Sequence, residues 1–132
     1  MSAEAVAVIE RFNEELMQRG EIPWDLLDSE LVLVDHDLPD AGDYRGHEGI
    51  AKWIEDWSAA WESTTVEPES LVDAGDVILA TLLVTARGKG SGIETKRRNA
   101  TVNTVENGRI TRVEYFTTEE EARAAAGLGA AT

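Results

Sequence analysis

The chain has 132 residues, 26 acidic and 12 basic side chains, a formal net charge of −14 and no cysteine. An acidic surface of this kind repels phosphate backbones and anionic lipid headgroups, which argues against nucleic-acid and membrane partners. The lack of cysteine excludes disulfides, thiolate metal ligands and a cysteine nucleophile.

The N-terminal third of the chain alternates between helical and extended patterns. Apolar residues recur at helical spacing over residues 5–16, and Pro23 can open a second, short helix over Trp24–Leu27. A strand is predicted over Leu31–Asp37, followed by an irregular segment rich in glycine and proline. The N-terminus is acidic, and no apolar run is long enough to span a bilayer, so the sequence predicts a cytoplasmic protein.

A third helix is the best-patterned element. Its apolar stripe consists of Ile50, Trp53, Ile54, Trp57 and Trp61, with charged residues off the stripe. Three tryptophans on one helical face form a large apolar surface, which needs a concave partner.

From Thr64 onward the hydrophobic period becomes two, which predicts strands. Their expected ranges are Thr65–Leu71, Val77–Arg87, Ile93–Val105 and Ile110–Thr117. Asn107-Gly108 is a type I′ turn signal, so the last two strands should be antiparallel neighbours. A capping-box pattern at residues 118–121 opens a final helix that ends at Gly127, after which a frayed tail is expected.

The order of these elements predicts one domain over residues 1–132. Helices that are segregated from antiparallel strands indicate an α+β fold, with a long-stranded sheet curling around the tryptophan-bearing helix. One face of the closing strands is rich in Ala100, Val102, Val113 and Tyr115, and the other mixes Asn103 with charged and aromatic residues. Both faces therefore need cover, which predicts a homodimer through the sheet.

Several segments together resemble one known family. They are Tyr44–Ile50 with Trp53 and Trp57, Gly75–Val77, Arg87–Gly92, Asn107–Ile110 with Tyr115, and Glu120–Ala122 with Ala126–Leu128. In this order they resemble SnoaL-like, nuclear-transport-factor-two-like proteins. The resemblance implies a cone-shaped α+β barrel with one pocket, commonly dimeric. It implies no single function, because relatives include ketosteroid isomerases, polyketide cyclases, epoxide hydrolases, dehydratases and members that only bind.

The densest titratable group is Asp35-His36-Asp37. Strand alternation puts Asp35 and Asp37 on one face and His36 on the other, so the three cannot converge on a metal, and neither metal nor cofactor is predicted. Asp37 lies nine positions before Gly46, where the resemblance places the proton-shuttling carboxylate of ketosteroid isomerases. Asp37 is therefore the candidate general base; the alternative is a solvated strand end.

The resemblance also shows what is missing. The positions of the isomerase oxyanion donors hold Phe12 and Ala100, which cannot donate, so ketosteroid isomerisation is disfavoured. Asp37, Arg87 and Asn103 are the right residue types to hold and activate a water, as in epoxide hydrolases. A surface ion pair is the alternative reading of Arg87.

Aromatic residues are the other candidates for ligand contact. Trp24, Trp53, Trp57 and Tyr115 could line an apolar pocket, although core packing explains the helical spacing equally well. His47, just before the third helix's stripe, is expected to be exposed.

Two functions remain open at this point. The first is an enzyme of isomerase, cyclase, dehydratase or hydrolase type, which uses a pocket carboxylate for proton transfer or water activation on an apolar, cyclic small molecule. The second is a non-catalytic module that binds an apolar ligand in a tryptophan-lined pocket.

Overall fold

A computed structural model describes residues 2–36, 42–75 and 77–128 of the chain. Within these residues the helical segments are α1 (Ser2–Asn13), the π-helical η1 (Glu14–Gln18), the 3₁₀-helical η2 (Trp24–Leu26), α2 (Gly46–Ala60) and α3 (Glu119–Ala125). The strands are β1 (Leu27–Asp35), β2 (Gly42–Arg45), β3 (Trp61–Asp73), β4 (Ile78–Gly88), β5 (Glu94–Glu106) and β6 (Arg109–Phe116).

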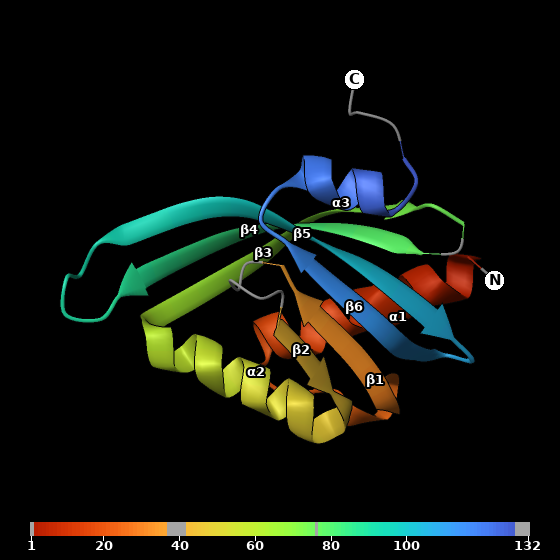
Figure 1. Cartoon of the computed structure of the whole chain (residues 1–132), viewed down its shortest axis with the longest axis horizontal. Helices are drawn as coiled ribbons and strands as arrows, with labels where there is room; N and C mark the ends of the chain where they lie inside the picture. The colour runs from red at the N-terminus through yellow and green to blue at the C-terminus, as the bar shows by residue number, and fades with distance from the viewer. Residues whose placement is uncertain (1, 37–41, 76, 129–132) are drawn as a thin grey trace.

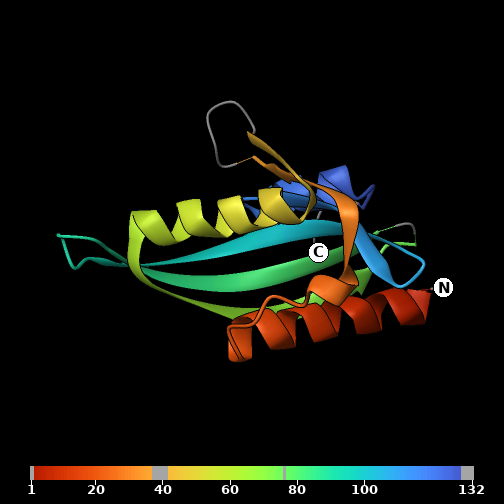
Figure 2. The same cartoon turned by 90° about the horizontal axis from the view of Figure 1, so that it is seen from below.

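The strands form one curved sheet in the order β2-β1-β6-β5-β4-β3. Neighbours are antiparallel except β1 and β6, which run parallel. Helices α1 and α2 lie against the concave face and α3 against the convex face (Figures 1 and 2). The predicted α+β fold with a mostly antiparallel sheet is confirmed; the sheet is open, with β2 and β3 as its edges, and does not close into a barrel.

Two glycines allow α2 to begin close against the sheet. Gly46 has φ +69°, and a Cβ there would lie 3.0 Å from the carbonyl oxygen of Ser29 on β1. A Cβ on Gly49 would lie 2.9 Å from the backbone of Tyr44 on β2. The contact at Gly49 is shorter than real Cβ atoms show. The contact at Gly46 is tighter than most of them, and its positive φ also disfavours a side chain, so the glycines fix where the helix meets β1 and β2.

The helix ends one residue earlier than its apolar stripe predicts. Trp61, expected on the helix, is extended (φ −127°, ψ 143°) and pairs with Gly88 as the first residue of β3. An aromatic residue followed by threonines and a valine favours a strand, and the pairing with β4 outweighs the helical spacing.

The hairpin between β5 and β6 contains a β-bulge. Its turn is the predicted one, since Asn107 and Gly108 have φ of +52° and +76°, as a type I′ turn requires. Pairing is regular as far as Ile110 and resumes at Arg112, which leaves Thr111 as an extra residue in β6.

That extra residue decides which side chains share a face. Without it, Ala100 would lie opposite Tyr115, as the sequence pattern led us to expect. In the structure Ala100 lies opposite Phe116, and Asn103 lies opposite Val113. The expected grouping of Ala100 with Tyr115 is therefore wrong, because one inserted residue reverses the alternation of a strand.

The convex face is covered in part by α3. Leu79, Ala100, Val102 and Phe116 pack with Ala122 of α3 in one apolar cluster, and Leu128 packs against it. Thr118 caps the helix as predicted, because its hydroxyl accepts from the backbone N–H of Glu121 at 3.2 Å. The predicted frayed tail beyond Leu128 lies outside the described residues.

This cover bears on the predicted homodimer. The apolar residues at this end of the convex face already have a partner in their own chain, so they give no reason for a second copy. Dimerisation through the rest of the sheet stays a prediction. No helix among the described residues is both long and apolar enough to cross a membrane.

Candidate functional site

A cavity of about 480 Å³ lies between the helices and the concave face of the sheet. Its walls come from α1, η1 and α2 on one side and from β1, β3, β4, β5 and β6 on the other. Most of the lining side chains are aliphatic or aromatic, with a few hydroxyl and amide groups contributed mainly by β3 and β5. Such a space suits an apolar small molecule fixed by a few polar contacts.

Three aromatic rings form one wall of the cavity. Trp53 and Trp57 of α2 both meet the ring of Tyr115 edge-on, with centroids 5.8 and 6.0 Å apart. The two indoles are themselves 6.4 Å apart at an interplanar angle of 68°. Edge-to-face packing of this kind holds each ring in place and presents a fixed apolar surface to the cavity.

A buried carboxylate lies next to this wall. Asp35, the last residue of β1, is 2% exposed and is the register partner of Tyr115 across the parallel pair. Trp53 donates its indole N–H to Oδ2 of Asp35 at 2.7 Å. A buried carboxylate needs such donors, so Asp35 also fixes the orientation of the Trp53 ring.

The inner face of β5 carries two buried amides. Asn99, with no exposed surface, donates from Nδ2 to the hydroxyl of Tyr115, while its Oδ1 has no hydrogen-bond partner among the described residues. Asn103 donates to the carbonyl of Ile78 at 3.2 Å and to the hydroxyl of Thr101 at 3.0 Å. The bulge in β6 brings these amides to the same face as Tyr115.

Four of the residues predicted to contact a ligand line the cavity: Trp53, Trp57, Asn103 and Tyr115. Trp24 is 38% exposed and lies against the imidazole of His47, with centroids 5.0 Å apart. The predicted base, Asp37, lies outside the described residues.

The predicted water-activating set is not assembled by the described residues. Arg87 donates to the carbonyl of Gly92 at 3.3 Å and lies 3.8 Å from Glu94, at the turn end of the β4–β5 hairpin. Asn103 of β5 lies opposite Ile78, at the other end of β4 from Arg87. Ile78 and Arg87 are nine residues apart, so their side chains point to opposite faces of the sheet. The surface reading of Arg87 is therefore the one that its contacts support.

The two histidines lie apart from each other. His36 is on the opposite face of β1 from Asp35, stacked on Phe116 at 4.4 Å and bonded to Glu114 at 3.0 Å. His47 is half-buried and donates to the carbonyl of Leu27 at 2.9 Å, so the expectation that it is exposed is wrong. It joins the start of α2 to β1. No group of three or more His, Asp or Glu side chains within the described residues could hold a metal ion.

A charged network lies on the solvent side of α2. Lys52 donates to Oδ1 of Asp56 at 2.8 Å, and the hydroxyl of Tyr44 donates to Oδ2 at 3.1 Å. The bond from Lys52 holds the pKa of Asp56 below its ordinary value. Burial, and then the bond to Asp56, raise the pKa of Tyr44.

Three features of the site were not found from the sequence. Asp35 was placed on the same face as Asp37 but was not proposed for a role, although its alternation with Leu31 and Leu33 is a signal for burial. Asn99 gave no signal, because its face depends on the bulge. The π-helical turn after Asn13, which helps to line the cavity, also has no clear pattern in the sequence.

Comparison with known proteins places the chain in a family. The sequence pattern described as the SnoaL-like domain matches residues 8–113, most of the chain. Among curated proteins none matches.

Solved structures share the fold. TerC, co-crystallised with polyporic acid, is 13% identical with a TM-score of 0.73, over 94% of this chain and 98% of that one. A Catenulispora acidiphila protein with a ketosteroid isomerase-like fold, in complex with trimethylamine, is 19% identical with a TM-score of 0.71, over 92% and 93%. A Jannaschia protein described as a SnoaL-like polyketide cyclase is 15% identical with a TM-score of 0.72, over 98% and 95%.

Proposed function

The chain belongs to the SnoaL-like family, and from that premise we propose that it is an enzyme that moves a proton on an apolar, cyclic small molecule held in the cavity. The observation that carries the proposal is the buried Asp35, fixed by Trp53 beside an aromatic wall. Structural neighbours crystallised with polyporic acid or trimethylamine are consistent with a small-molecule cavity.

The roles we propose follow from the order of residues along β1. Asp35 is a positioning residue, because its carboxylate accepts a hydrogen bond from the indole N–H of Trp53. Asp37, two residues further along the chain, stays the predicted base. Its carboxylate would take a proton from a carbon next to a substrate carbonyl, and the electron pair would move onto the carbonyl oxygen.

Tyr115 is the proposed partner of that oxygen. Phe12 and Ala100 stand where ketosteroid isomerases carry their donors, and neither can donate. Tyr115 lines the cavity, and its hydroxyl accepts from Asn99. In this role the hydroxyl would donate its own proton to the substrate oxygen, and the bond it accepts would strengthen the one it donates.

A non-catalytic binding module is the second candidate. The observation in its favour is that the amide of Asn103 is already bonded to Ile78 and Thr101. The part of the cavity around Asn103 therefore presents mainly aromatic rings and aliphatic groups to a ligand. On this reading the cavity selects by shape and apolar surface alone.

Hydrogen exchange of a probe ketone separates the two candidates. We expect the protein to speed the exchange of the α-protons of 2-tetralone in D₂O, followed by NMR. Asp37→Asn should lower that rate at least about tenfold, because a general base contributes that much or more. Asp43→Asn is the matched control, since Asp43 is paired with Arg45 on β2, and it should leave the rate unchanged.

The other outcomes are equally informative. Binding of 2-tetralone without faster exchange would favour the binding module. An equal loss in Asp37→Asn and Asp43→Asn would refute the assigned base. No binding of apolar cyclic ketones at all would overturn both candidates.

A further inference from the structure

A cationic side chain lies on the concave face of the sheet, next to the cavity. Arg97 of β5 is half-buried and is the register partner of Val84 on β4, which pairs in turn with Val66 on β3. Partners across antiparallel strands point to the same face of a sheet. Val66 and Val84 both line the cavity, so Arg97 is the third member of a row whose other two members form part of its wall.

Arg97 also follows the group that we propose to bind the substrate oxygen. Asn99, which donates to the hydroxyl of Tyr115, is two residues along β5 from Arg97 and points to the same face. The two positions are about 7 Å apart along the strand. A guanidinium and the Tyr115 hydroxyl can therefore both be reached by one molecule of two fused rings.

The charge around Arg97 favours an anion. Lys96, Arg97 and Arg98 are consecutive, in a chain whose net charge is −14. Lys96 and Arg98 point to the convex face, where Arg98 pairs with Glu69 at 2.9 Å. None of the described residues that line the cavity is charged. Arg97 therefore brings a positive charge to the edge of an otherwise apolar wall.

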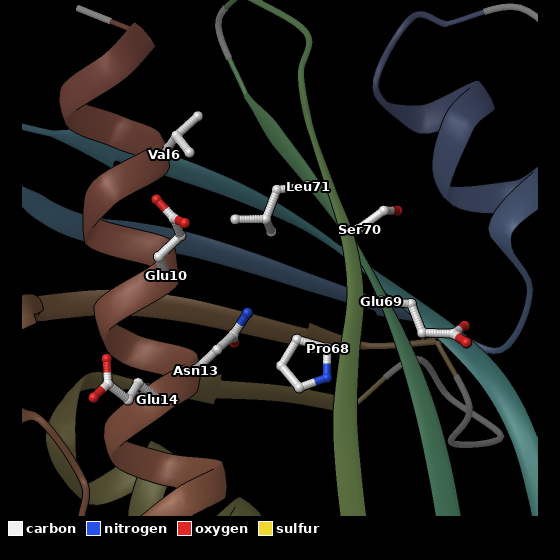
Figure 3. Close-up of a pocket in the computed structure, with 8 residues that line it drawn as sticks. All are labelled: Val6, Glu10, Asn13, Glu14, Pro68, Glu69, Ser70 and Leu71. Atoms are coloured by element: carbon white, nitrogen blue, oxygen red, sulfur yellow. The ribbon is translucent and has the colours of Figure 1, made fainter.

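The opposite side of the cavity adjoins an acidic groove. This second hollow, of about 670 Å³, lies between α1 and the edge strand β3 (Figure 3). Glu10 and Glu14 approach it from the helix, and Asn13 lines both hollows. An anion is repelled on the α1 side and attracted on the β5 side, so charge gives the cavity a direction.

We infer that the molecule held in the cavity carries a carboxylate, and that Arg97 binds it. The inference rests on the proposed function, because it names a feature of the same substrate. A guanidinium is planar and matches the two oxygens of a carboxylate with two parallel N–H donors. The ligand is then a cyclic ketone with its carbonyl at Tyr115 and its acid group at Arg97. Arg97 determines specificity and takes no part in the proton transfer.

Calorimetric titration with three bicyclic ketones tests the ligand class. The probes are 2-tetralone, its 6-carboxylate and its 6-carboxamide. The carboxylate should bind about ten-fold more tightly than the carboxamide of the same shape, the gain expected from hydrogen bonds to a charged group. A net charge of −14 opposes this preference, so general attraction cannot produce it.

The failures of the two proposals are distinguishable in this titration. Binding of 2-tetralone with no preference for the carboxylate would overturn the role of Arg97 and leave the proposed function standing. No binding of any of the three ketones would overturn both.

Variants of adjacent residues test the site itself. Arg97→Gln should bind the carboxylate and the carboxamide equally, whereas Arg98→Gln, the same charge change on the opposite face, should keep the preference. Equal loss in both variants would mean a long-range effect of charge and would overturn the inference. In the unsubstituted protein the Nε–H resonance of Arg97 should shift with the carboxylate and not with the carboxamide. Tight binding of the carboxylate without that shift would also overturn it.

Discussion

The two faces of the sheet use alternate residues of the same strands in different ways. On the convex face Ala100 and Val102 of β5 pack with Phe116 under α3 in a closed, wholly apolar cluster. On the concave face the alternate residues Asn99, Thr101 and Asn103 are polar, and Thr101 and Asn103 line a cavity of about 480 Å³. Strand β5 therefore contributes apolar residues to a packed core on one face and polar residues to the cavity side on the other.

The difference separates stability from function within one sheet. Apolar burial stabilises a fold in proportion to the surface removed from water, whereas a cavity and buried polar groups both lower stability. The concave face carries the destabilising features, a cost that proteins commonly bear at functional sites. The convex face holds the sheet together while the concave face stays open.

Phe116→Ala should have the largest effect. Phe116 is 6% exposed, and its truncation should lower the free energy of unfolding by about 3–5 kcal/mol, the usual loss for a buried phenylalanine. Urea denaturation followed by circular dichroism measures the loss, and Phe116→Leu is the milder control. Binding of 2-tetralone by the folded fraction should be unchanged. Weaker ketone binding would mean that the two faces are not independent.

The sequence was enough to predict the layers but not the assignment of faces. The stripe of α2 and the period of two in the long strands indicated the α+β fold, because burial against a neighbour imposes those periods. The Asn107-Gly108 turn was also readable. A bulge has no comparable signature, so Thr111 reversed the expected faces of β5 relative to β6 and hid Asn99 on the concave side.

Short elements were not predicted from the sequence for a different reason. β2 is four residues long and contains a glycine, so it has no period to read, and it forms only because β1 offers a free edge. For the candidate site, Trp53, Trp57 and Tyr115 could be proposed from helical spacing and alternation. The bond between Trp53 and Asp35 could not, because it joins residues whose separation in space depends on how α2 crosses β1.

Trp53→Phe should have the second largest effect and sharpens the account of the concave face. The substitution keeps an aromatic ring but removes the N–H that Asp35 accepts at 2.7 Å. The free energy of unfolding should fall by about 1.5–3 kcal/mol, the range for hydrogen bonds to charged groups. Trp57→Phe is the matched control, since its indole makes no hydrogen bond to any residue that the structure describes.

Denaturation curves of the two variants decide the point. If Trp57→Phe costs as much as Trp53→Phe, ring size alone would account for both, and the bond to Asp35 would contribute nothing measurable. In that case the carboxylate would lose its proposed role as the group that orients the aromatic wall.

The smallest loss of stability is expected from Asp56→Asn, in the polar network on the exposed side of α2. This loss is the reference against which the losses from buried polar contacts are compared. Lys52 and Tyr44 both donate to Asp56 on the exposed side of α2, and the bond from Lys52 holds the pKa of Asp56 below its ordinary 3.8. A depressed pKa means that the stabilisation is present above the unfolded value and is lost as the pH falls through the folded one. Asp56→Asn should lower Tm by no more than about 2 °C at pH 7, because solvent screens the network. In thermal melts this difference should stay constant from pH 5 to 8 and shrink as the pH falls below the ordinary pKa of 3.8. A difference that does not shrink in acid would mean that the carboxylate acts through packing instead of charge.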